Sequence, residues 1–218
     1  ELKHTKWVKL DKTFPITTDD YDGLWYSSEF TITLSAEDSL SGVAEIYYKI
    51  NDGPLMNVSF NGHPLIVLEG SNNTVEYWSL DAAYNEEPHS ILTNIKLDKT
   101  KPVAEAGIYQ PVNEDIVFIF DGSASSDNLA VKNYTWTFTD RVQQTLIGMK
   151  PAYTFETPGN YTVTLNVIDM AGNYATDTVI IMVLDLTKPA ANILHTVSSN
   201  LIVWMVTFDA GGSSDNVG

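Results

Sequence analysis

The sequence Leu10-Asp-Lys-Thr-Phe-Pro15 decides how this chain is organised, because it returns twice with small changes. It comes back as Leu97-Asp-Lys-Thr-Lys-Pro102 and again as Leu184-Asp-Leu-Thr-Lys-Pro189, both times after 87 residues. A fixed period of this size indicates a tandem array of similar domains. Proline lacks a backbone donor and disfavours helix interiors and central strands, so each hexamer is placed in a linker.

The hexamers divide the chain into two whole modules and two partial ones. The whole modules are 11–98 and 99–186. Residues 1–10 end in a short apolar run and look like the last strand of a preceding repeat. Residues 187–218 hold two candidate strands and then a Gly/Ser/Asp loop, as expected for the truncated start of a further module. Because two strands cannot bury a core alone, we expect two complete domains arranged end to end.

Every strong local signal within the modules is that of a β-strand, and no segment indicates a helix. Residues 30–36, 134–138 and 176–184 are rich in β-branched and aromatic residues and are bounded by Gly, Pro, Asn and Ser. From Tyr161 to Val167 apolar and polar residues alternate, which is typical of a strand with one buried and one solvated face. Roughly seven such strands in each module predict an all-β fold of tandem Ig-like antiparallel β-sandwiches.

Composition excludes several classes of function. The chain has 28 acidic and 12 basic residues and a net charge of −16, so nucleic acid and anionic membrane surfaces would repel it. We therefore expect no nucleic-acid partner, and membrane anchoring only through parts outside this fragment. The chain has no cysteine, so neither disulfides nor thiolate metal sites stabilise its small domains, which favours a prokaryotic surface or secreted origin.

Module two resembles a PKD domain, which is an Ig-like β-sandwich. The resemblance rests on Phe120-Asp-Gly-Ser-Ala-Ser-Ser-Asp127, Tyr134-Thr-Trp136-Thr-Phe, Tyr153-Thr-Phe-Glu-Thr-Pro-Gly-Asn-Tyr161 and Asp169-Met-Ala-Gly-Asn173. The segment after Trp136 departs from it, reading Thr-Phe-Thr-Asp-Arg where the family usually has a Gly-Asp-Gly turn. The truncated module repeats the opening as Phe208-Asp-Ala-Gly-Gly-Ser-Ser-Asp215, so it too resembles a PKD domain.

Module one resembles a different Ig-like repeat, found in bacterial and archaeal surface proteins. The matching residues are Phe30-Thr-Ile-Thr-Leu-Ser-Ala, Ser41-Gly-Val-Ala and Tyr47-Tyr-Lys-Ile-Asn-Asp-Gly. Arrays of such repeats usually form stalks, adhesins or surface-layer (S-layer) components. The resemblance therefore implies an extracellular or cell-surface location.

Few residues of the chain indicate chemistry. The four histidines are scattered without paired spacing, the chain has no cysteine, and the serines of the turn clusters have no histidine nearby, so we predict that the chain is not an enzyme. Trp136 is expected to fill the core, and Tyr161 to form a tyrosine corner. Six aromatic residues could form an exposed strip that binds sugar. Adjacent residues of a strand point to opposite faces of the sheet, however, so at least half of the six should lie in the core. These six are Trp25, Tyr26, Tyr47, Tyr48, Tyr77 and Trp78.

Three aspartates recur with the repeat: one in the linker, one after the second strand of the module, and one between its last two long strands. The sets are Asp11, Asp38 and Asp81 in module one and Asp98, Asp127 and Asp169 in module two. In an Ig-type sandwich, the loops that carry the second and third of these lie at the end where the chain enters. Each set should therefore meet at the junction with the preceding module.

Three carboxylates in a small volume repel one another unless a cation neutralises them. Ca²⁺ is the natural candidate, since it accepts roughly six to eight oxygen ligands, including Asn side chains and backbone carbonyls. Asn128 and Asn173 could join the set of module two. Alternatively, these are ordinary turn residues, because Asp and Asn cap loops by bonding their own backbone. The sequence leaves both interpretations open.

Four asparagines begin an Asn-x-Ser/Thr sequon and are glycosylation candidates: Asn57, Asn72, Asn133 and Asn160. The function that we predict is a non-enzymatic extracellular structural or adhesive segment, built from Ig-like repeats with calcium-stiffened linkers. Its partners would be other surface proteins or copies of itself, and glycans are a further option. The alternatives are an accessory domain array of a secreted hydrolase and a carbohydrate-binding module.

Overall fold

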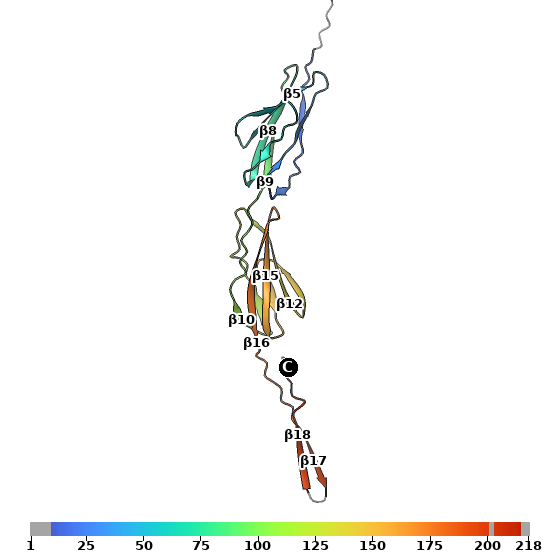
Figure 1. Ribbon diagram of the computed structural model, residues 1–218, viewed down its shortest axis with the longest axis vertical. Coiled ribbons are helices and arrows are strands. Elements are labelled where there is room, and N and C mark those ends of the chain that lie inside the picture. The colour runs from blue at the N-terminus through green and yellow to red at the C-terminus, as the bar shows by residue number, and fades with distance from the viewer. Residues whose placement is uncertain (1–9, 201–202, 215–218) are drawn as a thin grey trace, which may run out of the picture. The chain divides into compact units, whose positions relative to one another are not determined.

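The structure of the chain is a computed structural model that describes residues 10–200 and 203–214 (Figure 1). The described residues form β-strands, turns and loops without any helix, which confirms the all-β prediction. No helix long and apolar enough to cross a membrane occurs in this described part. The predicted last strand of a preceding repeat lies outside the described residues, apart from Leu10.

The chain divides into two compact units. Among the described residues, the first comprises 10–101 together with the loops 128–130 and 169–173, and the second comprises the remainder. Each unit has its own sheets and its own buried core.

The first unit is a sandwich of one five-stranded sheet and two two-stranded sheets. The large sheet has the strand order β2-β9-β8-β5-β6, and the small sheets pair β1 with β4 and β3 with β7. Neighbouring strands run antiparallel except β2 and β9, which are parallel. The strands are β1 (Ile16–Asp19), β2 (Trp25–Tyr26), β3 (Phe30–Thr31), β4 (Leu34–Glu37), β5 (Val43–Ile50), β6 (Met56–Val58), β7 (Leu65–Ile66), β8 (Gly70–Asp81) and β9 (Ser90–Leu97).

Apolar side chains from both layers of this unit meet in its core. Leu34 and Ile66 come from the small sheets, while Ile46, Val75 and Ile95 come from the large sheet, and all five are buried. The alternation of apolar and polar residues along β5 and β8 turns one side of each strand towards this core. The hydrophobic pattern thus fixes which side of the large sheet faces inwards.

The second unit has a five-stranded sheet in the order β10-β16-β15-β12-β13 and a two-stranded sheet of β11 and β14. Strand β10 runs parallel to β16, whereas β15 runs antiparallel to β16 and β12 antiparallel to β13. A separate hairpin pairs β17 with β18. The strands are β10 (Gln110–Asn113), β11 (Val117–Ile119), β12 (Val131–Asp140), β13 (Val142–Ile147), β14 (Ala152–Thr154), β15 (Gly159–Asp169), β16 (Tyr174–Leu184), β17 (Leu194–Asn200) and β18 (Val203–Asp209).

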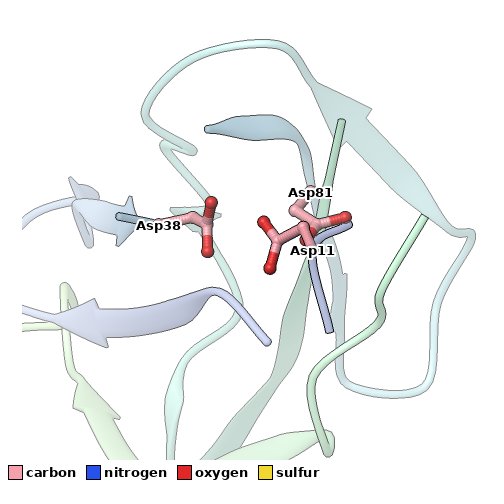
Figure 2. A group of neighbouring side chains, drawn as sticks. All are labelled: Asp11, Asp38 and Asp81. Carbon is pink, nitrogen blue, oxygen red and sulfur yellow. The ribbon is translucent and has the colours of Figure 1, made fainter. Parts of the chain in front are cut away.

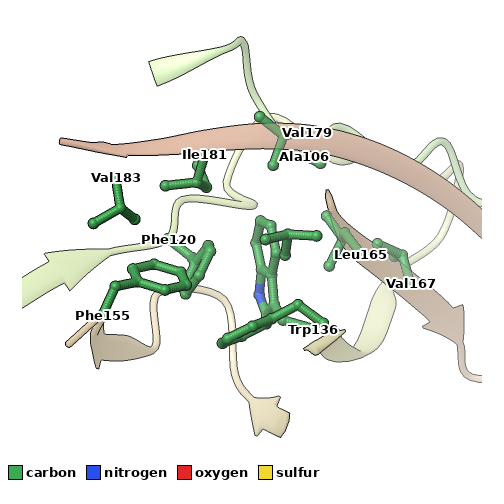
Figure 3. Close-up of a cluster of buried hydrophobic side chains, with 11 residues drawn as sticks. Ala106, Phe120, Trp136, Phe155, Leu165, Val167, Val179, Ile181 and Val183 are labelled. Atoms are coloured by element: carbon green, nitrogen blue, oxygen red, sulfur yellow. The ribbon is translucent and has the colours of Figure 1, made fainter. Parts of the chain in front are cut away.

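Trp136 lies at the centre of the second core, as the sequence predicts (Figure 3). Its side chain is fully buried, its ring lies 5.1 Å from that of Phe120, and its indole Nε1 donates a hydrogen bond to the backbone oxygen of Gly148 at 3.1 Å. The tyrosine corner is also present, because the Tyr161 hydroxyl donates to the backbone oxygen of Thr157 at 2.7 Å. Both features are those of an Ig-like sandwich.

Candidate metal centre

The three linkers share one local turn. In each of them the aspartate Oδ1 accepts a hydrogen bond from the backbone N–H of the threonine two residues later. The pairs are Asp11 with Thr13 at 2.9 Å, Asp98 with Thr100 at 3.2 Å and Asp185 with Thr187 at 3.0 Å. This turn is a physical reason for the repeated Asp-x-Thr signature, independent of any ion.

Asp11, Asp38 and Asp81 lie together at one end of the first unit (Figure 2). Asp11 precedes β1, Asp81 ends β8, and Asp38 follows β4. Asp38 thus follows the fourth strand of its module and not the second, because β2 and β3 are two-residue strands that the sequence does not set apart. Each of the three offers a carboxylate oxygen, and these oxygens all lie within 4.8 Å of one another.

Backbone donors hold the first two of these carboxylates in place. Asp38 Oδ1 accepts from the backbone N–H of Leu40 at 3.1 Å, of Ser41 at 2.8 Å and of Gly42 at 2.7 Å. The Ser41 N–H also donates to Asp11 Oδ2 at 2.9 Å. The loop after β4 therefore ties the linker aspartate to the body of the module.

Asp81 is positioned by the turn that follows β8. Its Oδ1 accepts from the backbone N–H of Ala83 at 2.9 Å and of Asn85 at 2.7 Å, and its Oδ2 accepts from Asn85 Nδ2 at 2.7 Å. The Asp81 side chain is fully buried. This carboxylate is thus fixed by its own turn before any cation is considered.

Hydrogen bonds lower the pKa of two of these carboxylates, Asp11 and Asp81. Donation from the side chain and backbone of Thr13 lowers the pKa of Asp11 to about 2, although desolvation acts in the opposite direction. Burial raises the pKa of Asp81, but hydrogen bonds from Asn85, Ser41 and Ala83 outweigh it and leave the pKa below its usual value. Negative charge is therefore concentrated here at neutral pH.

The three oxygens lie close enough together to contact one cation of the size of Ca²⁺. Oxygens on opposite sides of one Ca²⁺ lie about twice the Ca–O distance apart, which is roughly 4.6–5.2 Å. Oxygens that all lie within 4.8 Å of one another can thus contact a single calcium ion.

Only some of the corresponding residues of module two lie within one unit. Asp98 and Asp169 belong to the first unit and offer carboxylate oxygens within 4.8 Å of each other, whereas Asp127 is assigned to the second unit. Asn173 Nδ2 donates to Asp169 Oδ2 at 2.7 Å and to the backbone oxygen of Asp98 at 2.9 Å. Asn128 Nδ2 donates to Glu69 Oε2 at 3.4 Å. A calcium site built from this set stays a prediction.

Two glutamates that the sequence analysis missed accept hydrogen bonds from linker residues, and each belongs to the module that precedes its linker. Glu114, which is buried, accepts at Oε1 from the backbone N–H of Leu186 at 2.8 Å and from the N–H and hydroxyl of Thr187, each at 2.7 Å. Glu69 accepts from the N–H of Lys99 at 2.6 Å and from the Thr100 hydroxyl at 3.1 Å. Glu69 lies between β7 and β8 and Glu114 between β10 and β11, so the two do not occupy equivalent places and no shared motif could have revealed them.

The aromatic residues considered for sugar binding do not form one exposed strip. Tyr48 and Tyr77 belong to the core of the first unit. Trp78 is buried on the opposite side of β8, where its ring stacks 3.7 Å from that of His89 and 5.5 Å from that of Tyr47. The remaining members, Trp25, Tyr26 and Tyr47, are half-buried.

The four sequon asparagines all lie in strands: Asn57 in β6, Asn72 in β8, Asn133 in β12 and Asn160 in β15. Asn57, Asn72 and Asn160 are exposed, whereas Asn133 is half-buried and accepts the backbone N–H of Tyr134 at 2.9 Å. Glycosylation stays a prediction for all four.

Residues 99–183, less than half of the chain, match the family model of the PKD domain. Comparison with the curated proteins finds no match. Among solved structures, the chain is similar to the fibronectin(III)-like modules of Clostridium thermocellum CbhA, with 11% identity, a TM-score of 0.42 and coverage of 77% of this chain and 94% of that chain.

It is also similar to a structure from a 1.5-MDa bacterial ice-binding adhesin, with 12% identity, a TM-score of 0.41 and coverage of 85% of this chain and 70% of that one. A tetra-tandem repeat from the extending region of a large adhesion protein gives 14% identity, a TM-score of 0.34 and coverage of 94% and 66%. The family match assigns residues 99–183 to the PKD domain family.

Proposed function

We propose that this chain is a non-enzymatic structural or adhesive segment of an extracellular surface protein, such as a stalk or an S-layer component of a bacterium or archaeon. PKD and Ig-like repeats are typically non-catalytic modules, which supports this role. The single observation that carries the proposal is the repeated linker. Its aspartate closes a turn onto its threonine, and that threonine is in turn held by a glutamate of the preceding module.

A linker fixed in this way suits a spacer better than a flexible tether does. The Thr187 N–H donates hydrogen bonds to both Asp185 and Glu114, and the Thr100 hydroxyl donates to Glu69. Fewer backbone conformations are then open to the residues that leave each module. The segment would therefore keep its length when other parts of the protein are pulled or pushed.

Calcium is part of the proposal. Asp11, Asp38 and Asp81 would hold Ca²⁺ where the linker enters module one, with an equivalent site at Asp98, Asp127 and Asp169. The ion would supply the positive charge that neutralises each group of carboxylates and would cross-link the linker to its module. The partners of the segment would be other surface proteins, copies of this chain or glycans.

Electron microscopy of intact cells tests the surface location and the spacer role together. Antibodies against residues 11–186 should label intact cells, and deletion of these residues from the whole protein should bring a label on its outermost part closer to the cell envelope. As a control, antibodies against a protein inside the cell should label only permeabilised cells. Labelling of this chain only in permeabilised cells would refute the surface location, and an unchanged label distance would refute the spacer role.

A further inference from the structure

Strand β13 forms an open edge of the large sheet in the second unit. Among the described strands its only partner is β12, with which it forms six residue pairs from Thr135–Ile147 to Asp140–Val142. The end of the strand is pinned, because the Gly148 N–H donates to the Tyr134 backbone oxygen at 3.0 Å. The opposite edge of β13 therefore keeps a regular strand geometry, in which its outward backbone groups can hydrogen-bond with another strand.

The other edges of the two large sheets are protected and this one is not. Natural sheets block their edges with short strands, proline or charge. Strand β2 has two residues, β6 has three, and β10 contains Pro111. Strand β13 has six residues, Val-Gln-Gln-Thr-Leu-Ile, with no proline and no charge, and its terminal Val142 and Ile147 are 66% and 71% exposed.

Charge indicates what pairs with this edge. Two copies of a chain with a net charge of −16 repel each other almost everywhere, so they can meet only where neither brings acidic groups. The stretch from Val142 to Met149 has no acidic residue. A basic partner would instead be drawn to the acidic remainder of the surface. The edge of β13 therefore favours a second copy of this chain.

We propose that β13 pairs antiparallel with β13 of a second copy and joins two five-stranded sheets into one. Residues opposite each other must lie on the same side of the joined sheet. The two-fold axis between the copies must therefore pass between the two copies of one residue. Centred on Thr145, the pairing sets this residue opposite its own counterpart and Gln143 opposite Ile147 of the second copy. Both are pairs of β-forming, uncharged side chains.

Sedimentation of purified 1–218 at increasing concentration tests the pairing. The wild type dimerises, and Thr145→Lys weakens the dimer at least tenfold because two lysines then face each other across the axis. Thr162→Lys is the matched control, since Thr162 is an exposed threonine on β15, which has neighbours on both sides. Added salt tightens the dimer by screening the repulsion between the two acidic copies.

Cross-linking tests the register. The chain has no cysteine, so one introduced thiol can form a disulfide only between copies. Thr145→Cys gives a covalent dimer under mild oxidation, whereas Thr162→Cys does not. A wild type that stays monomeric at several hundred micromolar overturns the proposal. So does equal association of the wild type and Thr145→Lys, which would place the contact elsewhere, for example on the β17–β18 hairpin.

Discussion

Replacement of Asp38 by Asn separates the calcium interpretation from the turn interpretation. Asp38 Oδ1 accepts three backbone N–H groups, and Oδ2 lies 3.4 Å from the Thr13 hydroxyl. In Asp38→Asn the amide oxygen can keep the three turn bonds, and the new NH₂ group can donate to Thr13. The variant therefore removes one negative charge from the cluster and leaves the turn intact.

The expected size of the calcium effect follows from linkage. Extracellular modules bind Ca²⁺ with dissociation constants of about 10⁻⁴–10⁻³ M, so 10 mM Ca²⁺ exceeds the constant about 10- to 100-fold. Binding to the folded state then adds about 1.4–2.7 kcal/mol to the free energy of unfolding. For a domain of this size each kcal/mol raises the melting temperature by roughly 4–8 °C. Module one should thus melt roughly 6–20 °C higher in calcium.

Calorimetry with calcium and with chelator is the assay. We expect the calcium-dependent increase of module one to be lost in Asp38→Asn, while the variant in chelator is at least as stable as the wild type, because repulsion is relieved. Asp52→Asn is the matched control, since it removes one charge from an exposed turn outside the cluster. Equal melting temperatures of the wild type in calcium and in chelator would refute the metal site and leave the turn alone.

Three further predictions concern the packing and the linkers. Trp136→Ala should destabilise module two by about 3–5 kcal/mol in urea unfolding, because its fully buried indole fills the core. Glu114→Ala should cost about 1.5–3 kcal/mol and speed hydrogen exchange at the Thr187 amide, which it binds; unchanged exchange would contradict its role in the linker. Burial and the hydrogen bond to Asp19 raise the pKa of Tyr77 to about 12. Its stabilising effect, present below pH 10, should be lost as the pH rises through 12. Burial and the hydrogen bond to Asp140 raise the pKa of Tyr153 to about 12 as well, so Tyr77→Phe should reduce the late step of the absorbance titration and leave the part due to Tyr153.

The fold could be predicted because its signals are local or periodic. The repeated hexamers, the alternation along β15 and the PKD motifs each occupy a short stretch of chain, and Trp136 and Tyr161 have the predicted roles. The strand expected over 30–36 is instead divided into β3 and β4. Between them the Ile32 N–H donates to the backbone oxygen of Pro64, a partner that no local pattern reveals.

The candidate site could be predicted only where residues recur with the repeat. Asp11, Asp38 and Asp81 were found because they occupy equivalent places in two modules, and topology brings them together. Glu69 and Glu114 were missed because each meets its linker through a contact between residues far apart in sequence. Such contacts depend on how the loops fold back, which composition and spacing do not specify.

The parallel pairing of β10 with β16 has a mechanical consequence. Residues Gln110–Asn113 face Ile181–Leu184, and the chain enters the module ahead of β10 and leaves it after β16. Tension on the two ends therefore pulls these strands along their length in opposite directions. Their hydrogen bonds are then loaded together in shear, and they do not open one after another as in an unzipping hairpin. A module of ordinary thermal stability can in this way withstand a large stretching force.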